Sequence, residues 1–280
     1  MIEYAVVDDR ALGALAQRLI EIPGVVAVVL GGSRARGTYH PDSDIDLGLY
    51  YRGDLDVMTL RALAVQETGQ QAEVTDPGGW GPWVNGAGWL TIDNWRVDWI
   101  YRDLDRVDQI WADCQVGRYE VGTQAGHPLG FYSHSYAGEV ALCQVLADPS
   151  RELTNLRERA QTYPLALSAA LVNGLWEADF SVTLARYGAA GTDPTYAAGC
   201  LFRAVGVACH ALHGHAGQWL INEEGMVASA DRLPIAPHNF AARAQRLLGH
   251  VGESTQLIEQ IVSKAATLVG EVKTAVGRRP

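Results

Sequence analysis

Basic residues are scarce in this chain of 280 residues, and lysine is almost absent. Lys264 and Lys273 are its two lysines, and 22 basic residues face 32 acidic ones, for a net charge of −10. The acidic excess lies in residues 1–147, which hold 20 acidic and 10 basic residues, whereas residues 148–280 hold 12 of each. Because a nucleic-acid enzyme needs basic residues to neutralise phosphates, we expect no nucleic-acid partner. The acidic half favours Mg²⁺ and cationic small molecules.

Cysteine and long apolar runs are scarce as well. The four cysteines are scattered without a C-x-x-C pair, which is typical of buried thiols in a reducing compartment. No apolar stretch reaches the ~18 residues that a membrane span needs. The N-terminal residues lack a basic stretch followed by an apolar one, as a secretory signal would have. We therefore expect a cytoplasmic protein with no membrane contact.

The most informative segment that is present is residues 29–50, VLGGSRARGTYHPDSDIDLGLY. An apolar run over residues 25–30 predicts a buried strand that ends at Gly31, Gly32 and Ser33. Glycines at a strand end allow backbone N–H groups to approach an anion. The Ser33 hydroxyl and the Arg36 guanidinium add further donors for phosphate oxygens.

Two aspartates follow this turn with one residue between them. Asp44 and Asp46 interrupt an apolar run, and on a strand such residues point to the same face. Ile45 and Leu47 then point into the core. Neighbouring carboxylates repel each other unless they share a cation, and Mg²⁺ commonly takes one or two carboxylates together with phosphate oxygens. The segment thus predicts a phosphate-binding turn beside a magnesium site.

In combination these motifs resemble the DNA polymerase beta-like nucleotidyltransferase superfamily. The pattern is G-S-x-x-R-G followed by D-x-D, carried here by Gly32, Ser33, Arg36 and Gly37 and then by Asp44 and Asp46. The resemblance covers roughly residues 25–101. It implies nucleotidyl transfer from ATP or another nucleoside triphosphate with two Mg²⁺ ions. It also implies that Arg36 contacts the triphosphate, with Arg34 as the weaker candidate.

The superfamily uses a third carboxylate on a strand after the D-x-D motif, and Asp98 occupies such a position in WRVDWIY. Asp44, Asp46 and Asp98 are therefore the expected catalytic and metal-binding residues. Glu73 is the runner-up for the third carboxylate. The alternative for Asp98 is a salt bridge to Arg96 or Arg102.

Six of the eight tryptophans lie between residues 80 and 111. Trp80 and Trp83 belong to a Gly/Pro-rich loop, where a tryptophan can stack on a base or a sugar. The alternative is that they pack in the core, as we expect for Trp89, Trp95, Trp99 and Trp111.

The predicted fold is an α/β (α+β) nucleotidyltransferase domain with a small mixed sheet over residues 1–145, followed by an all-α helical bundle over residues 146–280. In the first domain, Asp54 is expected to cap the second helix. The expected helices there are 9–21, 55–69 and 103–116, and the expected strands after the motif are 71–75, 89–92 and 95–101. The expected helices of the second domain are 150–160, 164–187, 194–214, 222–232, 238–248 and 251–276.

This domain order resembles the aminoglycoside and lincosamide nucleotidyltransferases, in which the helical domain helps to bind the acceptor. We therefore predict transfer of a nucleoside monophosphate, AMP in the first instance, to a hydroxyl of a small molecule such as an aminoglycoside-like antibiotic, by a monomer or homodimer. An alternative is a toxin–antitoxin module that AMPylates a protein or RNA. In that case Arg203 and His210, seven residues apart on one helix, would resemble the R-x₄₋₆-H pair of HEPN ribonucleases. A nucleotide-binding regulator without catalysis is a third possibility.

Overall fold

The computed structural model describes residues 9–277, which form two compact units. The first unit comprises residues 9–112 and 120–162, and the second comprises residues 113–119 and 163–277. The predicted boundary near residue 145 falls inside a strand of the first unit. That strand pairs with residues 28–30 at one edge of the sheet, so a division there would cut the sheet.

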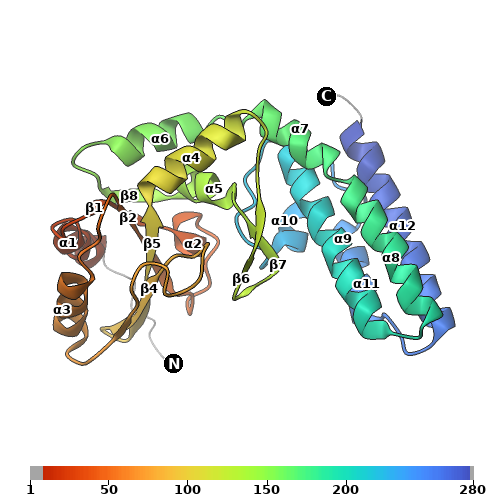
Figure 1. Ribbon diagram of the computed structural model, residues 1–280, viewed down its shortest axis with the longest axis horizontal. Coiled ribbons are helices and arrows are strands. Elements are labelled where there is room, and N and C mark those ends of the chain that lie inside the picture. The colour runs from red at the N-terminus through yellow and green to blue at the C-terminus, as the bar shows by residue number, and fades with distance from the viewer. Residues whose placement is uncertain (1–8, 278–280) are drawn as a thin grey trace. The chain divides into compact units, whose positions relative to one another are not determined.

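The first unit is built on a six-stranded mixed sheet with the strand order β3-β4-β5-β2-β1-β8 (Figure 1). Its strands are β1 (Val25–Leu30), β2 (Ile45–Tyr51), β3 (Glu73–Val74), β4 (Ala87–Ile92), β5 (Trp95–Asp103) and β8 (Gln144–Ala147). β2 and β5 are parallel, and the other neighbours are antiparallel. The small mixed sheet expected from the sequence is therefore confirmed.

One face of this sheet holds the hydrophobic core. Alternate residues of β2 and β5, including Leu47, Leu49 and Trp99, are fully buried there together with residues of α1 (Asp9–Leu19) and α3 (Val57–Thr68). Figure 1 shows both helices on the same side of the sheet. Because side chains alternate along a strand, Asp46 and Asp98 belong to the opposite face. The core thus determines which face of the sheet can carry the site.

Short elements complete the first unit. They are the helices α2 (Gly32–Ala35), α4 (Leu104–Gln115), α5 (Ser135–Leu142) and α6 (Glu152–Ala160), and the separate ribbon of β6 (Val121–Gln124) and β7 (His127–Tyr132). The sequence patterns predicted α4 and α6 but not α2, α5, β6, β7 or β8. The cap of α3 is Asp56, whose carboxylate accepts from the Thr59 N–H at 3.0 Å, so the prediction of Asp54 as the cap was wrong.

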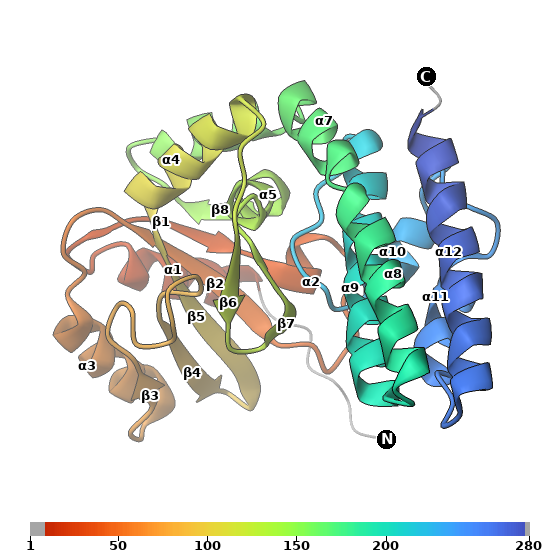
Figure 2. The same ribbon diagram turned by 45° about the vertical axis from the view of Figure 1, so that its right-hand side comes forward.

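The second unit is helical, as expected. It contains α7 (Leu165–Asn173), α8 (Trp176–Ala190), α9 (Pro194–His215), α10 (Met226–Asp231), α11 (Phe240–Gly249) and α12 (Thr255–Gly277). In Figures 1 and 2, α8, α9, α11 and α12 run side by side. The single helix predicted over 164–187 is broken at Gly174 and Leu175 into α7 and α8.

Helix α9 is the centre of this bundle and contacts α7, α8 and α12. By length and composition alone it would be able to cross a membrane, and it is the one such helix in the described part of the chain. Most of its apolar residues are buried inside the bundle, as expected for a core helix.

Candidate nucleotidyl-transfer site

The turn after β1 lies directly against Asp46. The Gly31 N–H donates to the Asp46 carbonyl at 2.8 Å and continues the pairing of β1 with β2. Gly32 follows with a φ of +58°, and a Cβ added to it would lie 1.8 Å from Asp46 Oδ2. Only glycine fits here, because any side chain would displace the carboxylate. The turn therefore brings backbone N–H groups and a carboxylate into one place.

Asp46 and Asp98 are register partners on the parallel strands β2 and β5. Their side chains point to the same face, and neighbouring strands lie about 4.8 Å apart. Burial raises the pKa of Asp46 to about 6, and the charges of Asp98 and Asp44 add to the shift while Arg36 opposes it. Burial and the charge of Asp44 raise the pKa of Asp98 to about 6, against the effect of Arg96. A cation placed between these carboxylates would relieve this cost.

Asp44 does not lie inside the strand, contrary to the sequence prediction, because β2 begins at Ile45. Its carboxylate forms an ion pair with Arg96, with 2.5 Å between Oδ1 and Nε. Among residues 9–277, no group of three or more His, Cys, Asp or Glu side chains is gathered closely enough to hold a metal ion. The ion pair with Arg96 uses one of the two carboxylate oxygens of Asp44.

Asp98 itself is not held in a salt bridge to either arginine considered from the sequence. Arg96 pairs with Asp44, and the buried Arg102 forms two bonds with Glu139, at 2.6 and 2.8 Å. Glu73 lies on β3, exposed and separated from β5 by the intervening strand β4. These positions favour Asp98 over Glu73 as the partner of Asp46.

The two arginines of the turn differ in their contacts. Arg34 donates to the Ser43 carbonyl at 2.7 and 3.1 Å and to the Asp44 carbonyl at 3.1 Å, so it fixes the loop that leads into β2. Arg36 donates from Nε to the Gly32 carbonyl at 3.0 Å, and its side chain is exposed. The Ser33 hydroxyl has no hydrogen-bond partner among the residues that the structure describes. Arg36 and Ser33 thus have donors available for a ligand, whereas Arg34 has a structural role.

The tryptophans of the loop are also of two kinds. Trp83 stacks on Phe131, with ring centroids 5.6 Å apart, and Gln124 accepts from its backbone N–H at 3.0 Å. Trp80 packs edge-on against Trp89, at 4.6 Å between centroids. Trp83 is therefore part of the packing of this loop, and Trp80 is held next to β4.

Trp89, which the sequence patterns assigned to the core, is a half-buried register partner of Asp98. It points to the same face as Asp98 and Asp46, opposite to the core. The signal for this position was present in the sequence, because the two-residue turn at Asp93 and Asn94 determines which residues pair across the hairpin. Across the sheet the order is therefore phosphate turn, Asp46, Asp98 and Trp89.

In the helical unit, Arg203 and His210 lie on α9 as predicted. Arg203 is paired with Glu177 of α8 at 2.5 and 3.0 Å, and His210 is buried. His213 is buried as well and is bonded to the Cys209 carbonyl and the Ser229 hydroxyl at 2.8 and 2.9 Å. These contacts hold the residues in the packing of the bundle: Arg203 is engaged with Glu177, and His210 and His213 are buried.

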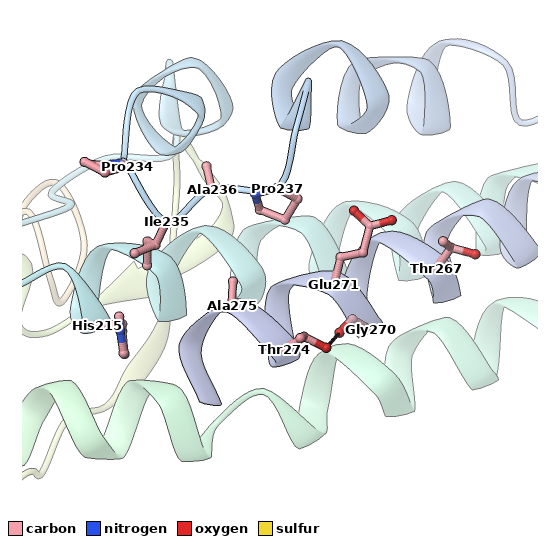
Figure 3. Close-up of a pocket in the computed structure, with 10 residues that line it drawn as sticks. All are labelled: His215, Pro234, Ile235, Ala236, Pro237, Thr267, Gly270, Glu271, Thr274 and Ala275. Atoms are coloured by element: carbon pink, nitrogen blue, oxygen red, sulfur yellow. Dashed lines mark hydrogen bonds between the residues drawn. The ribbon is translucent and has the colours of Figure 1, made fainter. Parts of the chain in front are cut away.

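The helical unit also contains a hollow of about 760 Å³ between α12 and residues 234–237 (Figure 3). Glu271 points into it, but Arg243 binds this carboxylate at 2.6 and 2.8 Å. Thr274 at its edge donates to the Gly270 carbonyl of its own helix. The acidic and hydroxyl groups of this hollow are thus already engaged within the protein.

Comparison with known proteins agrees with the chemistry of the first unit. Residues 12–76 match the family model of the nucleotidyltransferase domain. The chain therefore carries a nucleotidyltransferase domain and is a transferase enzyme of that class. The matched segment includes the turn and both motif aspartates, and it ends before Asp98.

A solved structure that this chain resembles is a nucleotidyltransferase-like protein from Exiguobacterium sibiricum 255-15. The sequences are 10% identical, the TM-score is 0.47, and the alignment covers 96% of this chain and 77% of the other. The search of curated proteins found no match.

Proposed function

We propose that the protein transfers a nucleoside monophosphate, AMP in the first instance, from a nucleoside triphosphate to a hydroxyl of a small molecule. The observation that carries this proposal is the pairing of Asp46 with Asp98 beside the glycine turn. It combines two carboxylates of raised pKa with backbone donors on one face of the sheet, over its two central strands. Nucleotidyl transfer needs these two elements together, since it depends on positioning and on neutralising phosphate charge.

The residues present fit Mg²⁺. Asp46 and Asp98 would hold it together with phosphate oxygens, with Asp44 as the third carboxylate, and two ions are expected. Two carboxylates on adjacent strands next to the Gly32 turn provide the hard oxygen ligands that Mg²⁺ prefers. Bound Mg²⁺ would supply positive charge against the triphosphate and lower the pKa of an attacking hydroxyl.

The phosphate end of the site is the turn itself. The backbone N–H groups near Gly32, the Ser33 hydroxyl and the Arg36 guanidinium would bind the triphosphate oxygens. Arg36 lies close enough to Asp46 to lower its pKa, so its charge already acts at the reacting end. Arg34 holds the loop before β2 and would keep Asp44 and Asp46 in place.

Asp98 lies one strand further from the turn and is the proposed base. With a pKa of about 6 it is largely ionised at neutral pH and able to accept a proton. The acceptor hydroxyl would give its proton to Asp98, and its oxygen would form a bond to the α-phosphorus. The bond from that phosphorus to the bridging oxygen breaks, and pyrophosphate leaves with the electron pair.

The acceptor would then lie over β5 and β4, against the Trp89 and Trp80 rings. An indole ring can stack on a flat ring of a ligand, and it can also bind a cation over its face. The acidic first half of the chain favours a cationic acceptor, such as an aminoglycoside-like antibiotic, over a polynucleotide. The helical unit keeps its predicted role in acceptor binding as part of the proposal. A cytoplasmic location also remains a proposal, supported by free cysteines, three of them buried.

The alternative, AMPylation of a protein or RNA by a toxin–antitoxin module, shares the same first step. Nothing in the described residues favours its ribonuclease part, because His210 is buried and Arg203 is paired with Glu177. The two transfer reactions differ in their acceptor, so an experiment that identifies the acceptor separates them.

The test is incubation of the protein and Mg²⁺ with each nucleoside triphosphate labelled at the α-phosphorus. Acceptors are a panel of hydroxylated antibiotics, a small-molecule cell fraction, total protein and total RNA. Label on a small molecule supports the proposal, and label on protein or RNA supports the alternative. Absence of transfer to any of these fractions contradicts both and favours a non-catalytic nucleotide-binding protein.

A further inference from the structure

Helix α8 carries an apolar stripe that faces solvent. Trp176, Phe180, Thr183 and Tyr187 are spaced at i, i+4, i+7 and i+11, which places them on one face. The aromatic residues among them are 66%, 51% and 67% exposed, in chain order. The opposite face of α8, with Ala178, Val182 and Ala185, is buried in the bundle.

This stripe continues onto the neighbouring helix. Tyr196, at the start of α9, is 45% exposed. It lies close enough to Tyr187 for that side chain to contribute to the raised pKa of Tyr196. Single exposed apolar residues are ordinary, but a continuous row of aromatic side chains on a rigid helix is typical of a protein–protein interface. The stripe therefore indicates a surface that is covered in the working protein.

We propose that the stripe is covered by the same stripe of a second copy of this chain, with the two α8 helices antiparallel about a two-fold axis. The axis would pass between residues 181 and 182. Trp176 would then meet the partner's Tyr187, and Phe180 would meet the partner's Thr183. Such a contact buries every member of the stripe, because its large residues lie symmetrically about its centre.

Charges beside the stripe favour this partner. Asp179 and Arg186 are seven residues apart, so they lie on the same side of α8. When identical helices pack antiparallel, each side meets the same side of the partner. In this register Asp179 and the partner's Arg186 are offset by roughly 3 Å along the helix, a distance that the long arginine side chain spans, and the two-fold axis produces this pair twice. Asp179 also binds Lys273 and remains 45% exposed. Arg186 is exposed and forms no ion pair with the other residues described, so a partner carboxylate has access to it.

The first test is the mass of the full-length protein in solution by light scattering during gel filtration, over a range of concentrations. The proposal predicts twice the chain mass of 30.3 kDa for the wild type and a mass of 30.3 kDa for Phe180→Glu. Met58→Glu is the control, since Met58 is 71% exposed on α3 of the other unit and should leave the dimer intact. Circular dichroism verifies that each variant is folded.

The second test uses the flanking charges, Asp179 and Arg186. Because Asp179 also pairs with Lys273 of α12, circular dichroism verifies that both charge variants are folded. Asp179→Arg alone and Arg186→Asp alone each bring like charges together, so each variant should dissociate at least ten-fold more readily than the wild type. Mixing the two variants should restore a dimer that contains one of each, because all facing charges are then opposite. A monomeric wild type, a dimer that survives Phe180→Glu, or variants that do not pair on mixing would each overturn the proposal.

Discussion

Asp46 and Asp98 stand next to each other on the parallel strands β2 and β5, and the pKa of each is raised to about 6. Burying two carboxylates next to each other costs stability, and such costly pairs are typical of functional sites. Their partners across the sheet differ, with the glycine turn on the Asp46 side and Trp89 on the Asp98 side. Because of this asymmetry, we assign the triphosphate to the side of Asp46 and the acceptor to the side of Asp98.

Asp98→Asn should lose turnover by about 100-fold or more, as expected on removing a general base, while nucleoside triphosphate still binds. The measurements are initial rates of transfer and nucleotide affinity by calorimetry. Glu73→Gln is the matched control, because Glu73 is exposed on β3 and should keep full activity. Full activity of Asp98→Asn would remove this residue from the mechanism.

Gly32→Ala should abolish transfer, because the new Cβ would lie 1.8 Å from Asp46 Oδ2. Gly37→Ala is the control for backbone strain. Gly37 also has a positive φ, +67°, but nothing lies within 4 Å of an added Cβ. Both variants should lose about 1 kcal/mol of unfolding free energy from the left-handed backbone, and only Gly32→Ala should lose activity as well. Equal activity in the two variants would show that the contact with Asp46 is unimportant.

The two arginines of the turn should respond differently to substitution by alanine. Arg36→Ala should weaken triphosphate binding by about ten-fold, the loss of one charged contact, at nearly unchanged stability. Arg34→Ala should lower the free energy of unfolding by about 1–3 kcal/mol, because it removes the bonds to Ser43 and Asp44. Nucleotide titration and chemical denaturation measure the two effects. The reverse outcome would exchange the roles of these residues.

The Arg102–Glu139 pair predicts a large effect on stability. Glu139→Ala leaves the Arg102 guanidinium buried without its carboxylate and should cost about 3–5 kcal/mol in chemical denaturation. Asp105→Ala is the control, because Asp105 pairs with Arg52 at the surface and should cost at most about 1 kcal/mol. The double variant Arg102→Met with Glu139→Leu should recover part of the loss. A cost near that of Asp105→Ala would contradict the buried pair.

The sequence predicted the candidate site best where its chemically important residues lie within a clear local pattern of secondary structure. The glycine turn, the strand that carries Asp46 and the hairpin that carries Asp98 were all predicted from local pattern, because apolar alternation and turn residues are local properties. The pairing of β2 with β5 lies beyond such patterns, since it joins residues about 50 positions apart. That pairing is what brings Asp46 and Asp98 together.

The errors have physical causes as well. Asp44 was placed inside the strand, but its pairing with Arg96 and the bonds from Arg34 hold it in the preceding loop. Helix α5 and strand β8 were missed because their residues are short apolar runs, which periodicity does not resolve. Trp89 was assigned to the core from its apolar character, although the register of its hairpin directs it to the side of Asp98.

The most direct test of the central claim is to follow both ends of the triphosphate in one reaction. The wild-type protein is incubated with Mg²⁺, an acceptor mixture and nucleoside triphosphate labelled at either the α- or the γ-phosphorus, beside Asp46→Asn. Our account predicts α-label on the acceptor, γ-label in pyrophosphate and neither product with Asp46→Asn. Label from the γ-phosphorus on the acceptor, or transfer that survives Asp46→Asn, would contradict it.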